Sequence, residues 1–255
     1  MKILRYIVAS LMVLLATDAM AWRAEINRAV LLFAEENLSN RAKREVESLL
    51  NAPLSSLEFE NKGMNKTRLN EDGKSVTTDE KDAVVMLEKA IATLEDKGAT
   101  AEARRRALHT VAETTVDIHC LANILIDKHL EKDFTFGRHN SMQIGFRYYA
   151  VKRMNWQELW HKEYHRTHGG VFSAEMYLYD MKIATAGMAK HYKRQPVAPR
   201  RWAEQTGEQA LRLLKLIYPD ALVEMSEVSN MEDINDASMY AAGFHLANLL
   251  NKTLK

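Results

Sequence analysis

The sequence predicts an all-α protein, a single mostly helical domain, on the strength of three observations. Apolar residues recur at three- and four-residue spacing through most of the chain, which is the period of a helix with one buried face. Glycine and proline, which interrupt helices, number only 10 and 4 among 255 residues. We also find no alternating apolar and polar runs, no hairpin-type turns and no internal repeat.

The first 21 residues have the layout of a secretory signal peptide. A lysine and an arginine precede the apolar run YIVASLMVLLA, and AMA at 19–21 is an A-x-A cleavage site. The apolar run is too short to span a bilayer, and an uncleaved anchor is the alternative. We therefore expect residues 1–21 to be removed and the protein to be exported to a periplasm or secreted. The mature domain, residues 22–255, then begins at Trp22 and contains no transmembrane segment.

The first half of the mature domain divides into helices at recognisable signals. Residues 24–50 are helical by periodicity, and Ser39 is a candidate N-cap that separates two helices. The polar, aperiodic stretch 54–76 is predicted to be a long surface loop. The sequence TTDE at 77–80 has the form of a capping box and predicts a helix from there to about Leu94.

Further helices are expected in the second half. One begins near Thr100 and continues into the 120s, followed by a loop with the sequence EKDFTFGRHNSMQ. Others are expected at about 150–165, 171–190 and 200–216. The final helix carries an apolar face made of Met239, Ala242, Leu246, Leu249 and Leu250.

Composition limits the classes of function. The formal net charge is +1, so no overall positive field attracts nucleic acid or membranes. The only cysteine is Cys120, which excludes an internal disulfide. It lies in an apolar segment, and we expect a buried, inert thiol. We find neither a glycine-rich phosphate loop nor a serine nucleophile elbow.

Two polar groupings have the spacing of metal ligands. His109, Glu113 and Asp117 lie at i, i+4 and i+8 on one face of the predicted central helix. A solvated or hydrogen-bonded polar face explains the same pattern, and spacing alone favours it. His161 and His165 are also four residues apart, but the end of a surface helix again explains them.

Trp156 and Trp160 are likewise four residues apart. At this spacing both rings lie on one face of a helix. This pattern favours packing in the core over a platform on which bases stack.

Four stretches of the mature chain, in order, resemble the S1/P1 nuclease family, which has the fold of zinc-dependent phospholipase C. They are the helix after the cleavage site, WRAEINRAVLLFAEENLSNRAKREVESLL; the central helix, ALHTVAETTVDIHCLAN; the motif MNWQELWH; and the C-terminal segments PRRWAEQTGEQALRLLKLIYPD and AAGFHLANLLN. The resemblance implies that fold and covers nearly all of residues 22–255. Members of the family use three zinc ions to hydrolyse phosphodiester bonds in single-stranded DNA and RNA and 3′-nucleotides.

The resemblance also assigns metal positions, and most of them are substituted. The family's first residue, a tryptophan whose amine and carbonyl bind zinc, is retained as Trp22, and its bridging aspartate is retained as Asp117. An aspartate of the third motif falls on His161. The family's histidines fall on Asn27, Glu113, Asn123 and Gln157.

Two more changes bear on this site. Leu121 replaces a proline that ends the family's central helix, so the helix is expected to run on and to turn Asn123 away from the cleft. The family's remaining aspartate and histidine would come from residues 54–76, which contain no histidine; Glu58 or Glu60 is the nearest acidic substitute.

Because amides are weak neutral ligands for zinc, we expect fewer than three zinc ions, or none. A reduced site of Trp22, Glu113 and Asp117, with His161, is the remaining metal prediction. The leading hypothesis is a non-catalytic or altered member that binds through the old cleft, with single-stranded nucleic acid or a nucleotide as the expected partner. The alternative is an active metal-dependent endonuclease or 3′-nucleotidase, and a helical interaction module is a third. The sequence predicts no oligomeric state.

Overall fold

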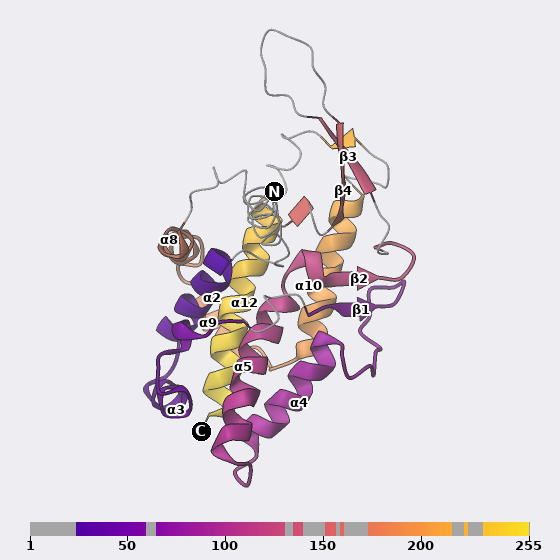
Figure 1. The fold of residues 1–255 in the computed structure, drawn as a ribbon. Coiled ribbons are helices and arrows are strands. Elements are labelled where there is room, and N and C mark those ends of the chain that lie inside the picture. The colour runs from indigo at the N-terminus through magenta and orange to yellow at the C-terminus, as the bar shows by residue number, and fades with distance from the viewer. Residues whose placement is uncertain are drawn as a thin grey trace, which may run out of the picture.

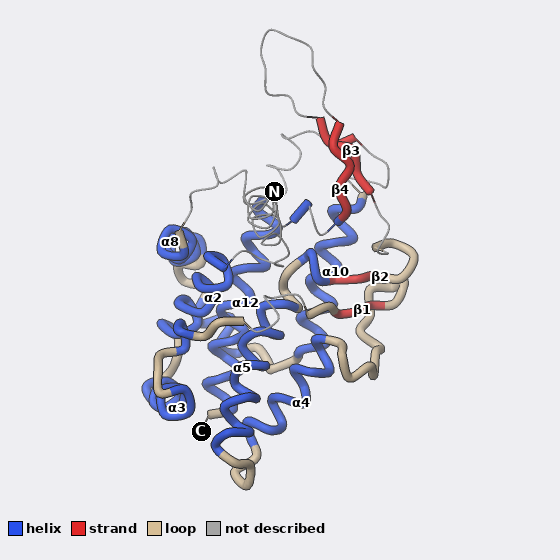
Figure 2. Tube along the Cα trace, in the orientation of Figure 1, coloured by secondary structure: helices blue, strands red, loops and turns tan. Residues whose placement is uncertain are grey.

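The computed structural model describes residues 24–59, 65–130, 135–139, 151–156, 159–160, 173–215, 222–223 and 232–254. Figures 1 and 2 show that most of this part of the chain is helical, as predicted. The α-helices are α2 (Ala24–Glu36), α3 (Asn40–Leu50), α4 (Ala83–Glu95), α5 (Ala101–Asp117), α8 (Ala174–Ala184), α9 (Ala189–Arg194), α10 (Pro199–Leu214) and α12 (Glu232–Thr253). Two short 3-10 helices are η1 (Leu54–Ser56) and η2 (Leu121–Asn123).

Helices α5 and α12 form the middle of the helical bundle (Figure 1). Helix α5 packs against α2, α3, α4 and α12. The predicted apolar face of α12 is buried at all of its positions, Met239, Ala242, Leu246, Leu249 and Leu250. None of the described helices is long and apolar enough to cross a membrane.

The N-terminal helices begin and end close to the predicted positions. Ser39 is the N-cap of α3, and its hydroxyl oxygen accepts the backbone N–H of Ala42 at 3.2 Å. The capping-box prediction at 77–80 is wrong, because α4 begins only at Ala83. Its N-cap is Asp82, which accepts the N–H of Val84 at 2.9 Å and also accepts hydrogen bonds from Thr67 and Arg68 of the strand at residues 67–69.

The central helix is shorter than predicted. Helix α5 ends at Asp117, and the next residues change to short turns in which Asn123 N–H bonds to the carbonyl of Cys120 at 2.9 Å. The expectation that the helix runs on through the 120s is therefore wrong. Asn123 lies at the end of η2, and its side chain points back to Asp117.

The structure also contains two small sheets that the periodicity did not predict. Strand β1 (Thr67–Leu69) pairs in parallel with β2 (Ile124–Ile126), with Thr67 opposite Ile124. Strand β3 (Thr135–His139) pairs with β4 (Val151–Asn155) in antiparallel and with β5 (Leu222–Val223) in parallel. The helix expected from 150 is thus wrong over 151–155. Strands of two to five residues are too short for alternation to reveal them.

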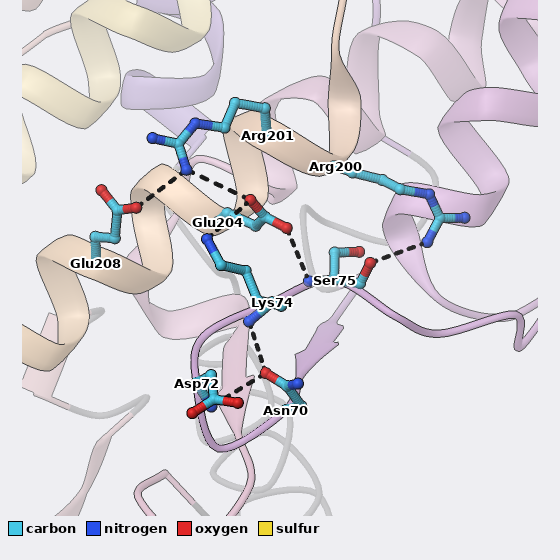
Figure 3. Close-up of polar contacts among 8 residues, drawn as sticks. All are labelled: Asn70, Asp72, Lys74, Ser75, Arg200, Arg201, Glu204 and Glu208. Carbon is cyan, nitrogen blue, oxygen red and sulfur yellow. Dashed lines mark hydrogen bonds and ion pairs between the residues drawn. The ribbon is translucent and has the colours of Figure 1, made fainter.

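The predicted loop at 54–76 is mostly irregular, but its later part is anchored to α10 (Figure 3). Glu204 accepts the backbone N–H of Ser75 at 3.2 Å and lies 3.5 Å from the ammonium of Lys74. Arg200 donates to the carbonyl of Ser75 at 3.3 Å and pairs with Glu88 of α4. These contacts fix the loop that leads out of β1.

The region expected to be one helix at 171–190 is instead two helices, α8 and α9. The chain turns between them at residues 185–188, where Gly187 has a φ of 83°. Glycine adopts this left-handed conformation more readily than any residue with a Cβ.

Candidate functional site

The site is centred on the carboxylate of Asp117, at the last residue of α5. Asp117 is 1% exposed, and both of its oxygens accept hydrogen bonds. Asn65 donates to Oδ2 from its backbone N at 3.1 Å and from its side-chain Nδ2 at 2.7 Å. Asn123 donates to Oδ1 from Nδ2 at 3.0 Å. Three N–H groups from two separate segments therefore surround one carboxylate. We call Asp117, Asn65 and Asn123 together the Asp117 cluster.

The pairing of β1 with β2 builds this cluster. Asn65 lies two residues before β1, and Asn123 lies directly before β2. Because the two strands are parallel and Thr67 is opposite Ile124, both asparagines lie at the same end of the ladder. That end meets the last turn of α5, where Asp117 is located.

Electrostatics at Asp117 are a balance between burial and hydrogen bonding. Burial raises the pKa of Asp117 well above its ordinary value, and the nearby carboxylate of Glu113 raises it further. The hydrogen bonds from Asn65 and Asn123 act in the opposite direction, because they stabilise the ionised form. Glu113 itself is 6% exposed, one turn before Asp117 on the same helix.

The helical face predicted from spacing is divided by the fold. Glu113 and Asp117 are buried together near the end of α5, whereas His109 is only half-buried, a turn further from the cluster. Asp117 accepts hydrogen bonds, as one of the two explanations of this spacing, a hydrogen-bonded polar face, predicts.

Asn27 of α2 is buried, with 5% of its surface exposed, and it lines a pocket of about 560 Å³. The pocket lies between the first turns of α2 and the segment around η1. Its lining also includes exposed Arg28, exposed Glu58 and half-buried Phe59. One of the two acidic residues proposed from the sequence, Glu58, therefore lies in the same pocket as Asn27.

The remaining predicted site residues lie outside the described part of the chain. They are Trp22, Gln157 and His161, together with Glu60 and His165. The roles proposed for them stay predictions.

The described residues of this site do not fit a zinc cluster. Zinc needs lone pairs that converge on it from imidazole, thiolate or carboxylate groups. Here Asn65 and Asn123 direct N–H groups at the carboxylate that the resemblance makes a bridging ligand. Within the described residues, no three histidine, cysteine, aspartate or glutamate side chains converge as metal ligands. The groups around Asp117 therefore form hydrogen bonds with it.

Sequence reasoning missed Asn65, which holds Asp117 with two of its N–H groups. The signal for it in the sequence is weak, because the strand that follows, Thr67–Leu69, has only one apolar residue, Leu69. The prediction for Asn123 was wrong for a related reason. That prediction extended the central helix because no proline interrupts it. It did not include the turn that allows β2 to pair with β1.

Two predictions of burial are confirmed. Trp156 and Trp160 are 4% and 1% exposed, with ring centroids 5.4 Å apart, and Trp156 Nε1 donates to the carbonyl of Leu121 at 2.7 Å. They are core residues. Cys120 is fully buried, and burial raises the pKa of its thiol, so the unreactive neutral form predominates.

No protein-family model matches the chain, and no curated protein matches it.

Proposed function

We propose that this chain is an exported protein of S1/P1 nuclease type that no longer hydrolyses phosphodiesters and binds its ligand through the inherited cleft. The observation that carries the proposal is the Asp117 cluster. Asn65 and Asn123 occupy both oxygens of Asp117 with N–H donors. Three of the about four lone-pair sites of the carboxylate then accept N–H donors inside the fold, which leaves little capacity for a metal ion or a metal-bound water.

The pocket beside Asn27 is the proposed ligand site, and single-stranded nucleic acid or a nucleotide is the proposed ligand. Arg28 is an exposed guanidinium that suits a phosphate, because it can donate two parallel hydrogen bonds. Phe59 offers a ring on which a base can stack. The hydroxyls of Ser55 and Ser56 add neutral hydrogen-bonding groups to the same wall.

The first test is a zinc measurement on protein purified from an exporting host, with Trp22 confirmed as the first residue by N-terminal sequencing. We expect no zinc that depends on Asp117, and no cleavage of single-stranded DNA. Two or three tightly bound zinc ions, together with cleavage abolished by a chelator, would overturn the proposal. An N-terminus upstream of Trp22 would overturn the predicted cleavage alone.

The binding step is tested by fluorescence anisotropy with a labelled oligothymidylate. Arg28→Ala should weaken binding and reduce the slope of log affinity against log salt by about 1, because one phosphate contact is lost. Arg41→Ala is the matched control, since Arg41 is an exposed arginine on α3 that does not line the pocket. Equal effects of the two variants would contradict a ligand site at this pocket.

An active metal-dependent phosphodiesterase with a reduced metal site is the second candidate. The observation that favours it is the proximity of two buried carboxylates, Glu113 and Asp117, whose mutual repulsion a cation would relieve. In that case hydrolysis would be sensitive to a chelator and would be lost in Asp117→Asn.

A further inference from the structure

A second pocket, of about 320 Å³, lies between α9, α10 and α12. Three buried rings close it on the inside, those of His119, His245 and Trp202. His119 Nε2 lies 2.7 Å from His245 Nδ1, and the indole of Trp202 stacks on the imidazole of His245 with centroids 4.4 Å apart. The volume is at the lower end of the range for small-molecule sites, so the pocket suits a ligand with a single ring.

The wall that α12 contributes consists of small residues. Ala237, Ser238 and Ala241 line the pocket, and their spacing of three and four residues places them along one side of the helix. Because these side chains are short, they leave the space between α12 and α10 open. We call this space the α10–α12 groove.

The opposite wall of the groove, on α10, carries a polar stripe. Gln205, Gln209 and Arg212 lie at i, i+4 and i+7, so they share one face of that helix, and all three line the pocket. At 1.5 Å of rise per residue the stripe is roughly 10 Å long. The hydroxyl of Ser238 donates to the side-chain oxygen of Gln209, which holds this amide between the two helices. A side-chain amide offers both donors and an acceptor whichever way its plane is turned, so the stripe can bind groups of both kinds.

The positive charge of this stripe lies at one end. Arg212 is exposed, and within the described part of the chain its guanidinium forms no ion pair. Glu208 also lines the pocket, but Arg201 pairs with its carboxylate at 3.1 Å (Figure 3). A planar guanidinium matches a carboxylate, because it can donate two parallel hydrogen bonds to it. The groove therefore presents a site for one negative charge at Arg212, followed by two neutral amides.

We propose that the α10–α12 groove binds a small polyhydroxylated carboxylate, such as a hexuronic acid, at a site separate from the pocket beside Asn27 and from the Asp117 cluster. The carboxylate accepts two hydrogen bonds from Arg212, and the ring hydroxyls exchange hydrogen bonds with the amides of Gln209 and Gln205. A hydroxyl both donates and accepts, so it pairs with either end of an amide. The apolar faces of the sugar ring pack on the alanines and on the aromatic inner wall.

The experiment is a calorimetric titration of the full mature protein with D-glucuronate, with D-glucose and acetate as matched probes. D-glucose keeps the ring and lacks the charge, whereas acetate keeps the charge and lacks the ring. We expect saturable binding of D-glucuronate, and binding of each matched probe that is weaker by at least about tenfold, because each probe loses part of the hydrogen bonding. Arg212→Gln should remove the preference for D-glucuronate over D-glucose, and the fold should persist because this side chain is exposed. Arg194→Gln, at an exposed arginine of α9 that does not line the pocket, is the matched control and should leave the affinity unchanged.

Ala237→Trp tests the groove itself. Ala237 is exposed where it lines the pocket, so a bulky side chain there fills the space without removing a binding group, and D-glucuronate binding should be lost. Absence of saturable D-glucuronate binding by the wild type would overturn the proposal. Equal affinity for acetate, or equal losses in Arg212→Gln and Arg194→Gln, would overturn it as well. Arg28→Ala separates this site from the proposed ligand pocket: the affinity for D-glucuronate survives that change, whereas binding of the oligothymidylate is weakened.

Discussion

The Asp117 cluster and the His119–His245 pair begin two residues apart on the chain and satisfy buried polar groups in opposite ways. Asp117 is a buried acid whose oxygens are matched by three N–H donors. The histidines are neutral bases joined in one direction, from the Thr115 carbonyl outward. The first arrangement gathers three N–H donors around one carboxylate, while the second joins two neutral rings through a single hydrogen bond. A buried acid therefore needs several donors from different segments, whereas each neutral ring is satisfied by one partner on each nitrogen.

The largest expected effect is on the pH dependence of stability. The histidine pKa values are lowered in the folded state, so the unfolded chain binds more protons below pH about 6.5. Each pKa unit corresponds to about 1.4 kcal/mol, so the free energy of unfolding should fall by several kcal/mol between pH about 6.5 and 4. Urea unfolding at a series of pH values measures this.

Asp117 changes stability in the opposite direction. Its pKa is raised in the folded state, so its contribution is complete below the unfolded pKa and is lost as the pH rises through the folded value. The variant His245→Phe should flatten the pH dependence between 6.5 and 4, and Asp117→Asn should steepen the loss on acidification. A curve of equal slope in all three proteins would contradict the comparison.

Truncation of the acid should have the next largest effect. Asp117→Ala leaves the side-chain amides of Asn65 and Asn123 without their acceptor, which should cost about 3 kcal/mol at neutral pH. Chemical denaturation measures the loss. Asp117→Asn, which keeps one acceptor oxygen and removes the repulsion with Glu113, should cost less. If the alanine variant is as stable as the wild type, the cluster does not hold these segments together.

Removal of one imidazole should cost less than removal of the acid, because no charge is involved. His245→Phe preserves a ring against Trp202 but leaves the Nε2 acceptor of His119 without its donor, at a cost of about 2 kcal/mol. Chemical denaturation of His245→Phe measures this cost. His191→Ala, which removes an exposed ring, is the control. An equal cost for both variants would show that the buried bond contributes nothing.

The smallest of these effects concerns the approach of α10 to β1. A Cβ at Gly207 would overlap Cδ1 of Leu69, a buried residue of the strand that brings Asn65 to Asp117. Gly207→Ala should therefore destabilise by about 1–2 kcal/mol through overpacking. Gly98→Ala, where the new methyl would meet only the Asp96 side chain at 3.2 Å, should cost less in the same thermal unfolding experiment.

Local signals in the sequence predicted the helices because each signal depends on neighbours in the chain. The N-cap at Ser39 and the apolar face of α12 are examples, since both need only a few consecutive turns. The capping box at 77–80 failed because Asp82, two residues after it, accepts hydrogen bonds from the helix and from strand β1 at the same time. A pattern of consecutive residues indicates the contact of Asp82 with its own helix, but not its contact with strand β1.

What the sequence determined by itself is the helical class of the domain and the presence of acid, amide and imidazole groups near the end of α5. What the tertiary structure decided is how they are paired. The parallel pairing of β1 with β2 joins segments more than fifty residues apart and brings Asn65 and Asn123 to Asp117. The packing of α12 against α5 likewise brings His245 to His119. Both outcomes depend on contacts between distant segments. Burial of the whole core brings these segments together, and the spacing of residues along the chain does not show which segments will meet.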